Sequence, residues 1–118
     1  LRKKKIIWCV FLLAGIFTPA LSQNNFRFEH ITVNEGLAHS DAVAVLQDRD
    51  GFIWIGTNNG IDRYDGYELK NYLMPNSNFN GLYNNRIQSL QLTRDGRIWA
   101  IADEQGVFFY APESDHFR

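Results

Sequence analysis

The sequence predicts an all-β protein, and three observations carry this prediction: an internal repeat, short β-prone runs within each copy, and tight turns between the runs. A period near 45 residues is typical of a unit of four short strands. The offset between copies is 45 residues up to the repeated Trp and 46 after one inserted residue. The paired positions are Gly36-Leu37 with Gly81-Leu82, Arg49-Asp50-Gly51 with Arg94-Asp95-Gly96, Ile53-Trp54 with Ile98-Trp99, Gly60 with Gly106, and Tyr64 with Tyr110.

The first copy, residues 36–73, predicts four strands joined by three tight turns. Residues 42–47 are β-prone and end at Asp48-Arg49-Asp50-Gly51, where glycine supplies the positive φ of a turn. Further strands are predicted over residues 52–57, 61–64 and 67–73, separated by Asn58-Asn59-Gly60 and Asp65-Gly66. This order predicts an up-and-down antiparallel sheet.

The second copy, residues 81–118, predicts strands over residues 87–92, 97–102 and 107–111, without a complete fourth strand. Before the first copy, residues 26–33 form a further β-like run, which we expect to be a strand that closes a blade outside this chain.

Units of this size are β-propeller blades, so residues 23–118 are expected to form about two four-stranded antiparallel blades of an incomplete propeller. Because two blades cannot close a ring, we expect the chain to be a fragment. The unpaired edges at both ends predict that residues 23–118 alone aggregate or are poorly structured.

The first 22 residues have the composition of a secretory signal peptide. A basic start precedes the apolar run Ile6–Phe17, and small residues follow it, with cleavage expected after Ser22. The apolar run is shorter than the roughly 20 residues that span a bilayer, which disfavours the alternative of an uncleaved membrane anchor. An exported chain is expected.

Charge and cysteine content exclude some partners. Removal of residues 1–22 leaves 8 basic against 13 acidic residues, a net charge of about −5, which argues against nucleic acid as a partner. The one cysteine, Cys9, lies in the predicted signal peptide, so the mature chain has no internal disulfide.

The repeat resembles the two-component regulator propeller repeat. The resemblance lies in Gly36-Leu37 and in the run from Gln47 to Gly66, QDRDGFIWIGTNNGIDRYDG. The second copy is weaker, because Trp99-Ala100-Ile101-Ala102 stands where Trp-Ile-Gly-Thr is expected, and Thr93 replaces the Asp that matches Asp48.

The resemblance implies a ligand-sensing region of a hybrid two-component histidine kinase and response regulator. Such a region lies in the periplasm, is tethered to the inner membrane, pairs as a homodimer in the full-length receptor, and responds to oligosaccharides. It controls transcription through downstream signalling domains, which these 118 residues do not contain. The partners implied are therefore an oligosaccharide and the remaining blades and domains of the receptor.

The recurring residues are interpreted as packing and turn positions, because ligand contacts vary between repeats whereas core positions recur. Trp54 and Trp99 have the alternative of stacking on sugar rings, but packing between blades is favoured. The full set of structural repeat positions is Gly36, Leu37, Asp48, Asp50, Gly51, Trp54, Gly56, Thr57, Gly60, Tyr64, Gly81, Leu82, Asp95, Gly96, Trp99, Gly106 and Tyr110.

No catalytic, metal or cofactor site is predicted. Asp48, Asp50 and Gly51 lack the further ligands of a calcium loop. His30, His39 and His116 lack the spacing of a metal pair, and the adjacent residues His39-Ser40-Asp41 cannot adopt the geometry of a hydrolytic triad.

The polar segment between the copies is the predicted ligand loop. Asn76, Asn78, Phe79 and Asn80 combine amide groups with an aromatic ring, a combination that suits a sugar, although Asn-rich segments are also plain loops. Two alternatives to the sensor stay open: a fragment of an exported propeller enzyme that degrades polysaccharides, and a truncated remnant without function.

Overall fold

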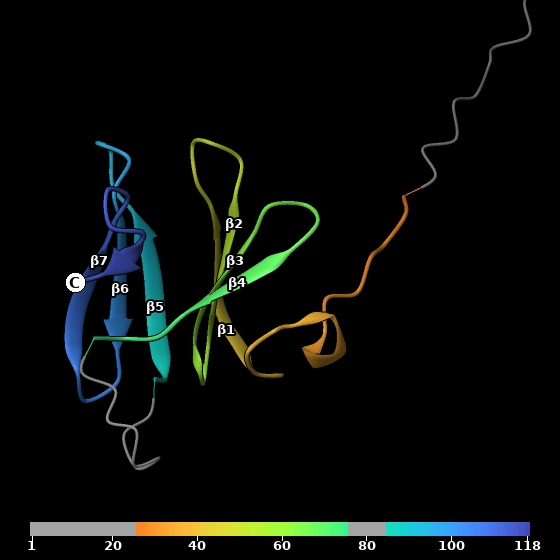
Figure 1. Ribbon diagram of the computed structural model, residues 1–118, viewed down its shortest axis with the longest axis horizontal. Helices are drawn as coiled ribbons and strands as arrows, with labels where there is room; N and C mark the ends of the chain where they lie inside the picture. Colours follow the sequence, from red (N-terminus) through yellow and green to blue (C-terminus); the bar gives the residue numbers. More distant parts are fainter. Residues whose placement is uncertain (1–25, 76–84) are drawn as a thin grey trace, which may run out of the picture.

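The computed structural model describes residues 26–75 and 85–118, which form two four-stranded antiparallel sheets (Figure 1). The predicted all-β class, built from four-stranded units, is confirmed. Strand bounds differ from the prediction by at most two residues. Blade 1 contains β1 (Ala42–Gln47), β2 (Ile53–Thr57), β3 (Gly60–Tyr64) and β4 (Leu69–Tyr72), and blade 2 contains β5 (Ile87–Leu92), β6 (Ile98–Ala102), β7 (Gly106–Ala111) and β8 (His116–Phe117).

The turns between first and second strands depend on glycine. Gly51 and Gly96 occupy the left-handed region, with φ of 94° and 86°, where a residue with a Cβ is disfavoured. In blade 1 the carboxylate of Asp48 accepts the backbone N–H groups of Asp50 at 3.0 Å and Phe52 at 2.9 Å. The repeated Asp-Gly dipeptide therefore specifies the same reversal of the chain twice.

The two blades also share an irregularity that the sequence pattern did not predict. In each blade the pairing of the first two strands shifts register once, between Ala42 and Ala44 in blade 1 and between Ile87 and Ser89 in blade 2. Ala42 and Ile87 are 45 residues apart, so the shift recurs at the same repeat position. The repeat thus extends to the backbone bulge, a feature that bends a strand locally.

The core lies between the blades, because each sheet buries one face against the other. Trp54 on β2 is 1% exposed and packs against Tyr110 and Phe117 of blade 2, with ring centroids 4.7 Å and 5.9 Å away. The buried residues of this cluster are Trp54, Ile61, Tyr72, Met74, Ile87, Ile98, Ala100, Ala102, Phe108 and Phe117. Alternation along each strand supplies these residues from one face of each sheet.

Gly56 allows the blades to approach closely. A Cβ at Gly56 would lie 2.7 Å from Cγ2 of Ile87, the first residue of β5. Real Cβ atoms do not reach that distance, so a larger residue would push the blades apart.

The structure differs from the prediction over residues 26–33. Residues 26–32 have no regular secondary structure, and Val33–Glu35 form a 3₁₀ helix, η1, so the strand prediction is wrong for Val33. Phe26 and Phe28 are exposed. A strand needs hydrogen bonds from a neighbouring edge, and no described strand pairs with this segment, so its role as a closing strand stays a prediction.

Residues 31–40 cover part of blade 1 on the side away from blade 2 (Figure 1). Thr32 caps η1, since its hydroxyl accepts the N–H of Asn34 while its own N–H donates to Glu35. Leu37 is buried, and the next N–H, of Ala38, donates to Asp62 on β3 at 2.9 Å.

The fourth strand of blade 2, β8, has only two residues, and the incompleteness of the second repeat stays a prediction. The predicted signal peptide, residues 1–22, lies outside the described part of the chain. Within residues 26–75 and 85–118, no helix is long and apolar enough to span a membrane.

Candidate functional site

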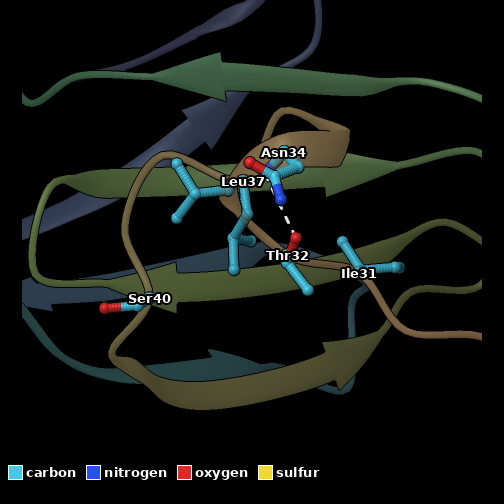
Figure 2. A pocket seen from close by; sticks show the side chains of 6 residues that line it. Ile31, Thr32, Asn34, Leu37 and Ser40 are labelled. Atoms are coloured by element: carbon cyan, nitrogen blue, oxygen red, sulfur yellow. Dashed lines mark hydrogen bonds between the residues drawn. The ribbon is translucent and has the colours of Figure 1, made fainter.

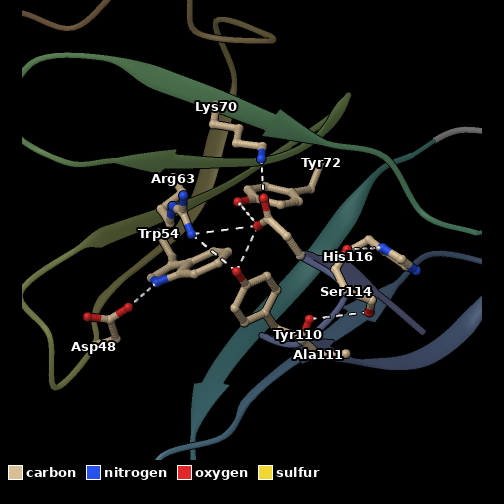
Figure 3. Close-up of polar contacts among 10 residues, drawn as sticks. Asp48, Trp54, Arg63, Lys70, Tyr72, Tyr110, Ala111, Ser114 and His116 are labelled. Atoms are coloured by element: carbon tan, nitrogen blue, oxygen red, sulfur yellow. Dashed lines mark hydrogen bonds and ion pairs between the residues drawn. The ribbon is translucent and has the colours of Figure 1, made fainter.

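The inter-blade clamp is the densest polar cluster in the described residues, and Figure 3 shows Arg63, Lys70, Tyr72 and Tyr110 converging in it. Asp115 lies at its centre. We define the clamp as Arg63, Lys70 and Tyr72 of blade 1 with Tyr110 and Asp115 of blade 2. The hydroxyls of Tyr72 and Tyr110 donate to Oδ1 of Asp115 at 2.7 Å and 2.8 Å. The ammonium of Lys70 donates to Oδ2, so three donors from two blades meet one carboxylate.

Arg63 links the clamp to the aromatic core. Its guanidinium donates to the hydroxyl of Tyr110 at 3.1 Å and lies 3.7 Å from Oδ1 of Asp115. The same group lies 4.8 Å above the ring of Phe52 and 5.6 Å above that of Trp54. Cation–π contact and ion pairing therefore hold Arg63 between the sheets.

A longer turn brings Asp115 to this position. In blade 1 the paired residues Tyr64 and Leu69 flank the turn between the third and fourth strands, whereas in blade 2 the equivalent pair is Tyr110 and Phe117, two residues further apart. Asp115 sits in the added length with a φ of 54°, a conformation that Asp tolerates better than most residues.

The contacts within the clamp shift the pKa values of Asp115, Tyr72 and Tyr110 in directions that preserve their hydrogen bonds. Lys70, followed by the two tyrosine hydroxyls, holds the pKa of Asp115 well below its usual range. Burial, followed by the bond to Asp115, raises the pKa of Tyr72, and the same causes raise the pKa of Tyr110. The carboxylate stays an acceptor and the phenols stay donors near neutral pH, an arrangement that suits a structural clamp and not proton transfer.

Trp54 is held by the turn that precedes it. Its indole N–H donates to Oδ2 of Asp48 at 2.7 Å, so one carboxylate organises the turn and orients the ring. In blade 2 the equivalent residue is Thr93, whose hydroxyl bonds the carbonyl of Arg97 and the carboxylate of Asp95. The two tryptophans of the repeat therefore have different partners: Trp54 packs between blades, whereas Trp99 lies against Phe109 of its own sheet, 5.4 Å away.

The repeated tyrosines also differ. Tyr110 belongs to the clamp, but the hydroxyl of Tyr64 donates to the carbonyl of Gly66 within its own turn. Thr57 is fully buried, and its hydroxyl donates to the carbonyl of Gly60 at 3.0 Å. These positions serve turns and packing in the structure.

A pocket of about 320 Å³ lies beside η1 (Figure 2), and none of its lining residues belongs to the clamp. Its lining consists of Ile31, Thr32, Val33, Asn34, Leu37 and Ser40. Thr32 and Asn34 bond one another, and the lining carries no charged side chain. The pocket thus has a partly apolar wall without a convergent set of free polar groups.

The predicted ligand residues Asn76, Asn78, Phe79 and Asn80 lie outside the described residues, as do the repeat positions Gly81 and Leu82. Among the residues that are described, no group of three or more His, Cys, Asp or Glu side chains is arranged to hold a metal ion. His39 accepts the N–H of Asp41 locally, and His116 contacts the carbonyl of Ser114.

Sequence reasoning did not single out Arg63, Lys70, Tyr72 or Asp115. None of them recurs at the repeat offset, and a repeat search finds only what recurs. The one inserted residue that the repeat revealed lies between Trp99 and Gly106, in the turn before β7, so it did not point to the longer turn between Tyr110 and Phe117 that carries Asp115.

Comparison with known proteins identifies the repeat. Residues 36–59 match the family model described as two component regulator propeller. A curated protein from Formosa agariphila, named histidine kinase P4, is 33% identical over 67 residues, which are 56% of this chain and 5% of that protein. The extracellular domain of a putative hybrid two component system from B. thetaiotaomicron superimposes with a TM-score of 0.62 at 22% identity, covering 76% of this chain and 13% of that one.

These comparisons agree with the resemblance expected from the sequence. The chain spans only a small share of each of these two proteins, so their complete activities are not carried over. The structural likeness shows a shared fold of propeller type, and the sequence match falls on the first copy, where the motif is strongest. Residues 36–59 therefore match the two-component regulator propeller repeat, and the described residues have a fold of propeller type.

Proposed function

We propose that this chain forms blades of the exported, ligand-sensing propeller of a hybrid two-component receptor. The observation that carries the proposal is the family repeat at residues 36–59, set in the first of two consecutive blades. In the complete receptor the propeller lies in the periplasm, is tethered to the inner membrane and pairs as a homodimer. A bound ligand then favours one arrangement of the paired propellers and so controls a kinase outside these residues.

The clamp supports a scaffold role for the described residues. Its tyrosines and carboxylate are engaged with one another between the blades, and Trp54 is buried. A sensor needs such a rigid support, because loops bind ligands best when a stable scaffold positions them.

We propose that the ligand is an oligosaccharide and that the segment containing Asn76, Asn78, Phe79 and Asn80 contacts it. Amide groups satisfy sugar hydroxyls, and an aromatic ring packs against the apolar face of a sugar. The segment joins two blades in the sequence, which is where a propeller places its variable loops.

The length and location of the native polypeptide test the proposal. We would probe cell-envelope fractions with an antibody raised against residues 23–118. A receptor predicts a band many times larger than 13.7 kDa in the inner membrane. A band near 13.7 kDa, or one confined to the soluble periplasm, would contradict the receptor.

The same cells test the ligand. We expect a reporter of the regulated genes to respond to oligosaccharides released from a polysaccharide, and the response to be lost in a receptor in which Asn76, Asn78 and Asn80 are replaced by Ala. The immunoblot serves as the control for receptor level. An unchanged response would remove this segment from the ligand site.

A further inference from the structure

Gly56 and Ile87 fit one another across the observed contact between the blades. Gly56 lies on β2, and a Cβ placed there would lie 2.7 Å from Cγ2 of Ile87, the first residue of β5. Ile61 pairs with Gly56 across the sheet and belongs to the same buried cluster as Ile87. The row formed by Gly56 and Ile61 thus has room for the large side chain of Ile87.

Blade 2 carries a different row at the equivalent place. Ile101 is equivalent to Gly56 in the pairing of the first two strands, and Val107 pairs with Ile101 as Ile61 pairs with Gly56. Ile101 and Val107 are 36% and 59% exposed, whereas Ile61 is fully buried. Since alternate residues of a strand point to opposite faces and Ala100 is buried on the side of blade 1, this row lies on the side away from blade 1.

The row of blade 2 is larger than the row of blade 1. Ile101 has a full side chain where Gly56 has none, and Val107 is only one carbon smaller than Ile61. In the geometry of the observed contact, a blade that begins its first strand with Ile, as blade 2 does at Ile87, would overlap Ile101. Ala in place of that Ile removes three carbons, which restores the total number of side-chain carbons of the observed contact.

The repeat accepts Ala at this position without a change of backbone. Ala42 of blade 1 is equivalent to Ile87 of blade 2, because each begins the first strand of its blade and precedes the register shift of that strand. A first strand with the same bulge therefore forms with a small or a large residue at this place.

Two other groups of the observed contact recur in blade 2. The guanidinium of Arg49, in the first turn of blade 1, donates to the backbone carbonyl of Arg94 in the equivalent turn of blade 2. A Cβ at Gly96 in that turn would lie 3.5 Å from the side chain of Arg49. Arg94 takes the position of Arg49 in blade 2 and is exposed, and Trp99 takes the position of Trp54. Blade 2 therefore keeps two docking groups of blade 1 and changes the size of the row.

We propose that Ile101 selects the neighbour of blade 2: a blade whose first strand begins with Gly, Ala or Ser at the position of Ile87, packed in the geometry of the observed contact. The occupant is the blade that follows blade 2 in the complete receptor, so the inference rests on the proposed function. It adds a rule for the order of blades, since a blade with a large residue at this position is excluded from this place.

The size exchange is tested in the observed interface, which can be given the same residues. Gly56→Ile together with Ile61→Val gives blade 1 the row of blade 2 and sets it against Ile87. We expect this double variant to be overpacked and to melt about 5 °C or more below the unchanged chain. Adding Ile87→Ala should raise its melting temperature by about 5 °C or more, because the side-chain carbons then again fill the same volume.

The effect of Ile87→Ala should therefore change sign between the two backgrounds. In the unchanged chain it leaves a cavity, and we expect it to lower the melting temperature by about 10 °C or more. Ile98→Ala is the matched control, because Ile98 is another buried Ile of blade 2, and it should lower the melting temperature in both backgrounds.

Circular dichroism during heating measures all of these variants. A loss from Ile87→Ala in both backgrounds, as for Ile98→Ala, overturns the inference. If the double variant does not fold, a folded spectrum after Ile87→Ala is added is the expected result, and an unfolded triple variant overturns the inference.

The native receptor gives a second test. Peptide sequencing by mass spectrometry reads the residue nine positions before the glycine of the next first turn, as Ala42 precedes Gly51 and Ile87 precedes Gly96. Gly, Ala or Ser there is the expected result, and any larger residue overturns the inference. A native polypeptide near 13.7 kDa would instead contradict the proposed function, and the melting temperatures would still decide whether the exchanged residues fit.

Discussion

A single carboxylate attaches the segment before the first blade to the sheet. Asp62 is fully buried and accepts the N–H of Ala38 at 2.9 Å and the amide of Asn71 at 3.4 Å. Burial, which outweighs both hydrogen bonds, raises the pKa of Asp62 above its usual value. The charged form is therefore less favourable in the folded chain than in water.

The raised pKa predicts how Asp62 affects stability. The folded state binds the proton of Asp62 more tightly than the unfolded state does. The contribution of Asp62 to stability therefore falls as pH rises from the unfolded pKa to the folded pKa, and it stays low at higher pH. Asp62→Asn keeps an acceptor for Ala38 without the charge. We expect its melting temperature to exceed that of the unchanged chain by a few degrees at pH 7 and to equal it near pH 3.

Thermal melts followed by circular dichroism at both pH values check this prediction. Asp62→Ala is the control, because it removes the charge and the acceptor together and should destabilise the chain. A loss of stability at pH 7 in Asp62→Asn as large as that in Asp62→Ala would show that the fold needs the charge.

At the scale of elements, the turn between β7 and β8 decides whether the blades are joined by charge. Its added length carries Asp115 to the tyrosines and Lys70. The equivalent turn of blade 1 is shorter, and its Asp65 instead accepts the N–H groups of Tyr67 and Glu68 within the turn. In the shorter turn the Asp side chain bonds within its own turn, whereas in the longer turn the Asp side chain bonds residues of the other sheet.

Asp115→Asn tests this turn without changing its backbone preference, because Asn also tolerates positive φ. We expect a loss of about 1 kcal/mol in the free energy of unfolding at pH 7, a modest value because the carboxylate is partly exposed. The lowered pKa means that the stabilisation is present above the unfolded pKa and is lost as pH falls towards the folded pKa. The difference between the two proteins should therefore shrink in acid.

Denaturant titrations at pH 7 and in acid measure this difference. Asp103→Ala provides a control within one blade, since within the described part of the chain the carboxylate of Asp103 pairs with Arg86 and Gln88 of blade 2. If the difference in free energy of unfolding between Asp115→Asn and the unchanged chain does not change with pH, the loss comes from packing and not from charge.

At the scale of the whole molecule, the two blades share one core, and neither sheet buries its apolar face alone. Trp54 lies at the centre of that core with Tyr72 and Tyr110, at ring centroid distances of 5.5 Å and 4.7 Å. Because the buried surface belongs to both sheets, this core predicts that they unfold together. Aggregation or poor structure of residues 23–118 alone, expected from their unpaired edges, is the opposite outcome, and the cooperativity of the melt decides between the two.

Trp54→Ala should lower the free energy of unfolding by about 3–5 kcal/mol, the usual cost of a cavity left by a large aromatic residue. Trp99→Ala is the matched substitution, and we expect it to cost clearly less, because Trp99 is only partly buried and contacts Phe109 of its own sheet. Denaturant unfolding of dilute samples, followed by circular dichroism, compares the two. Equal losses of unfolding free energy in Trp54→Ala and Trp99→Ala would show that Trp54 does not contribute more to the core than Trp99.

If Trp54→Ala does not fold, Trp54→Phe provides the measurement. It keeps a ring in the core and loses the hydrogen bond to Asp48. Its loss should still exceed that of Trp99→Phe, whose indole has no equivalent Asp in the preceding turn.

The sequence by itself determined strands β1 to β7, their order and the turns between them. Repeated pairs such as Asp50-Gly51 and Asp95-Gly96 dictate the chain reversals through local backbone conformation, which depends on neighbouring residues only. The same repeat indicated the family, which the match at residues 36–59 bears out.

Only the tertiary structure decided what the repeated residues do. Trp54 and Trp99 occupy the same repeat position, yet one is buried between blades and the other lies on an outer face. The clamp around Asp115 and the buried carboxylate of Asp62 were likewise absent from the prediction. Their partners lie far away in the sequence, and burial and contact between such residues arise from the packing of whole sheets, which a local pattern does not encode.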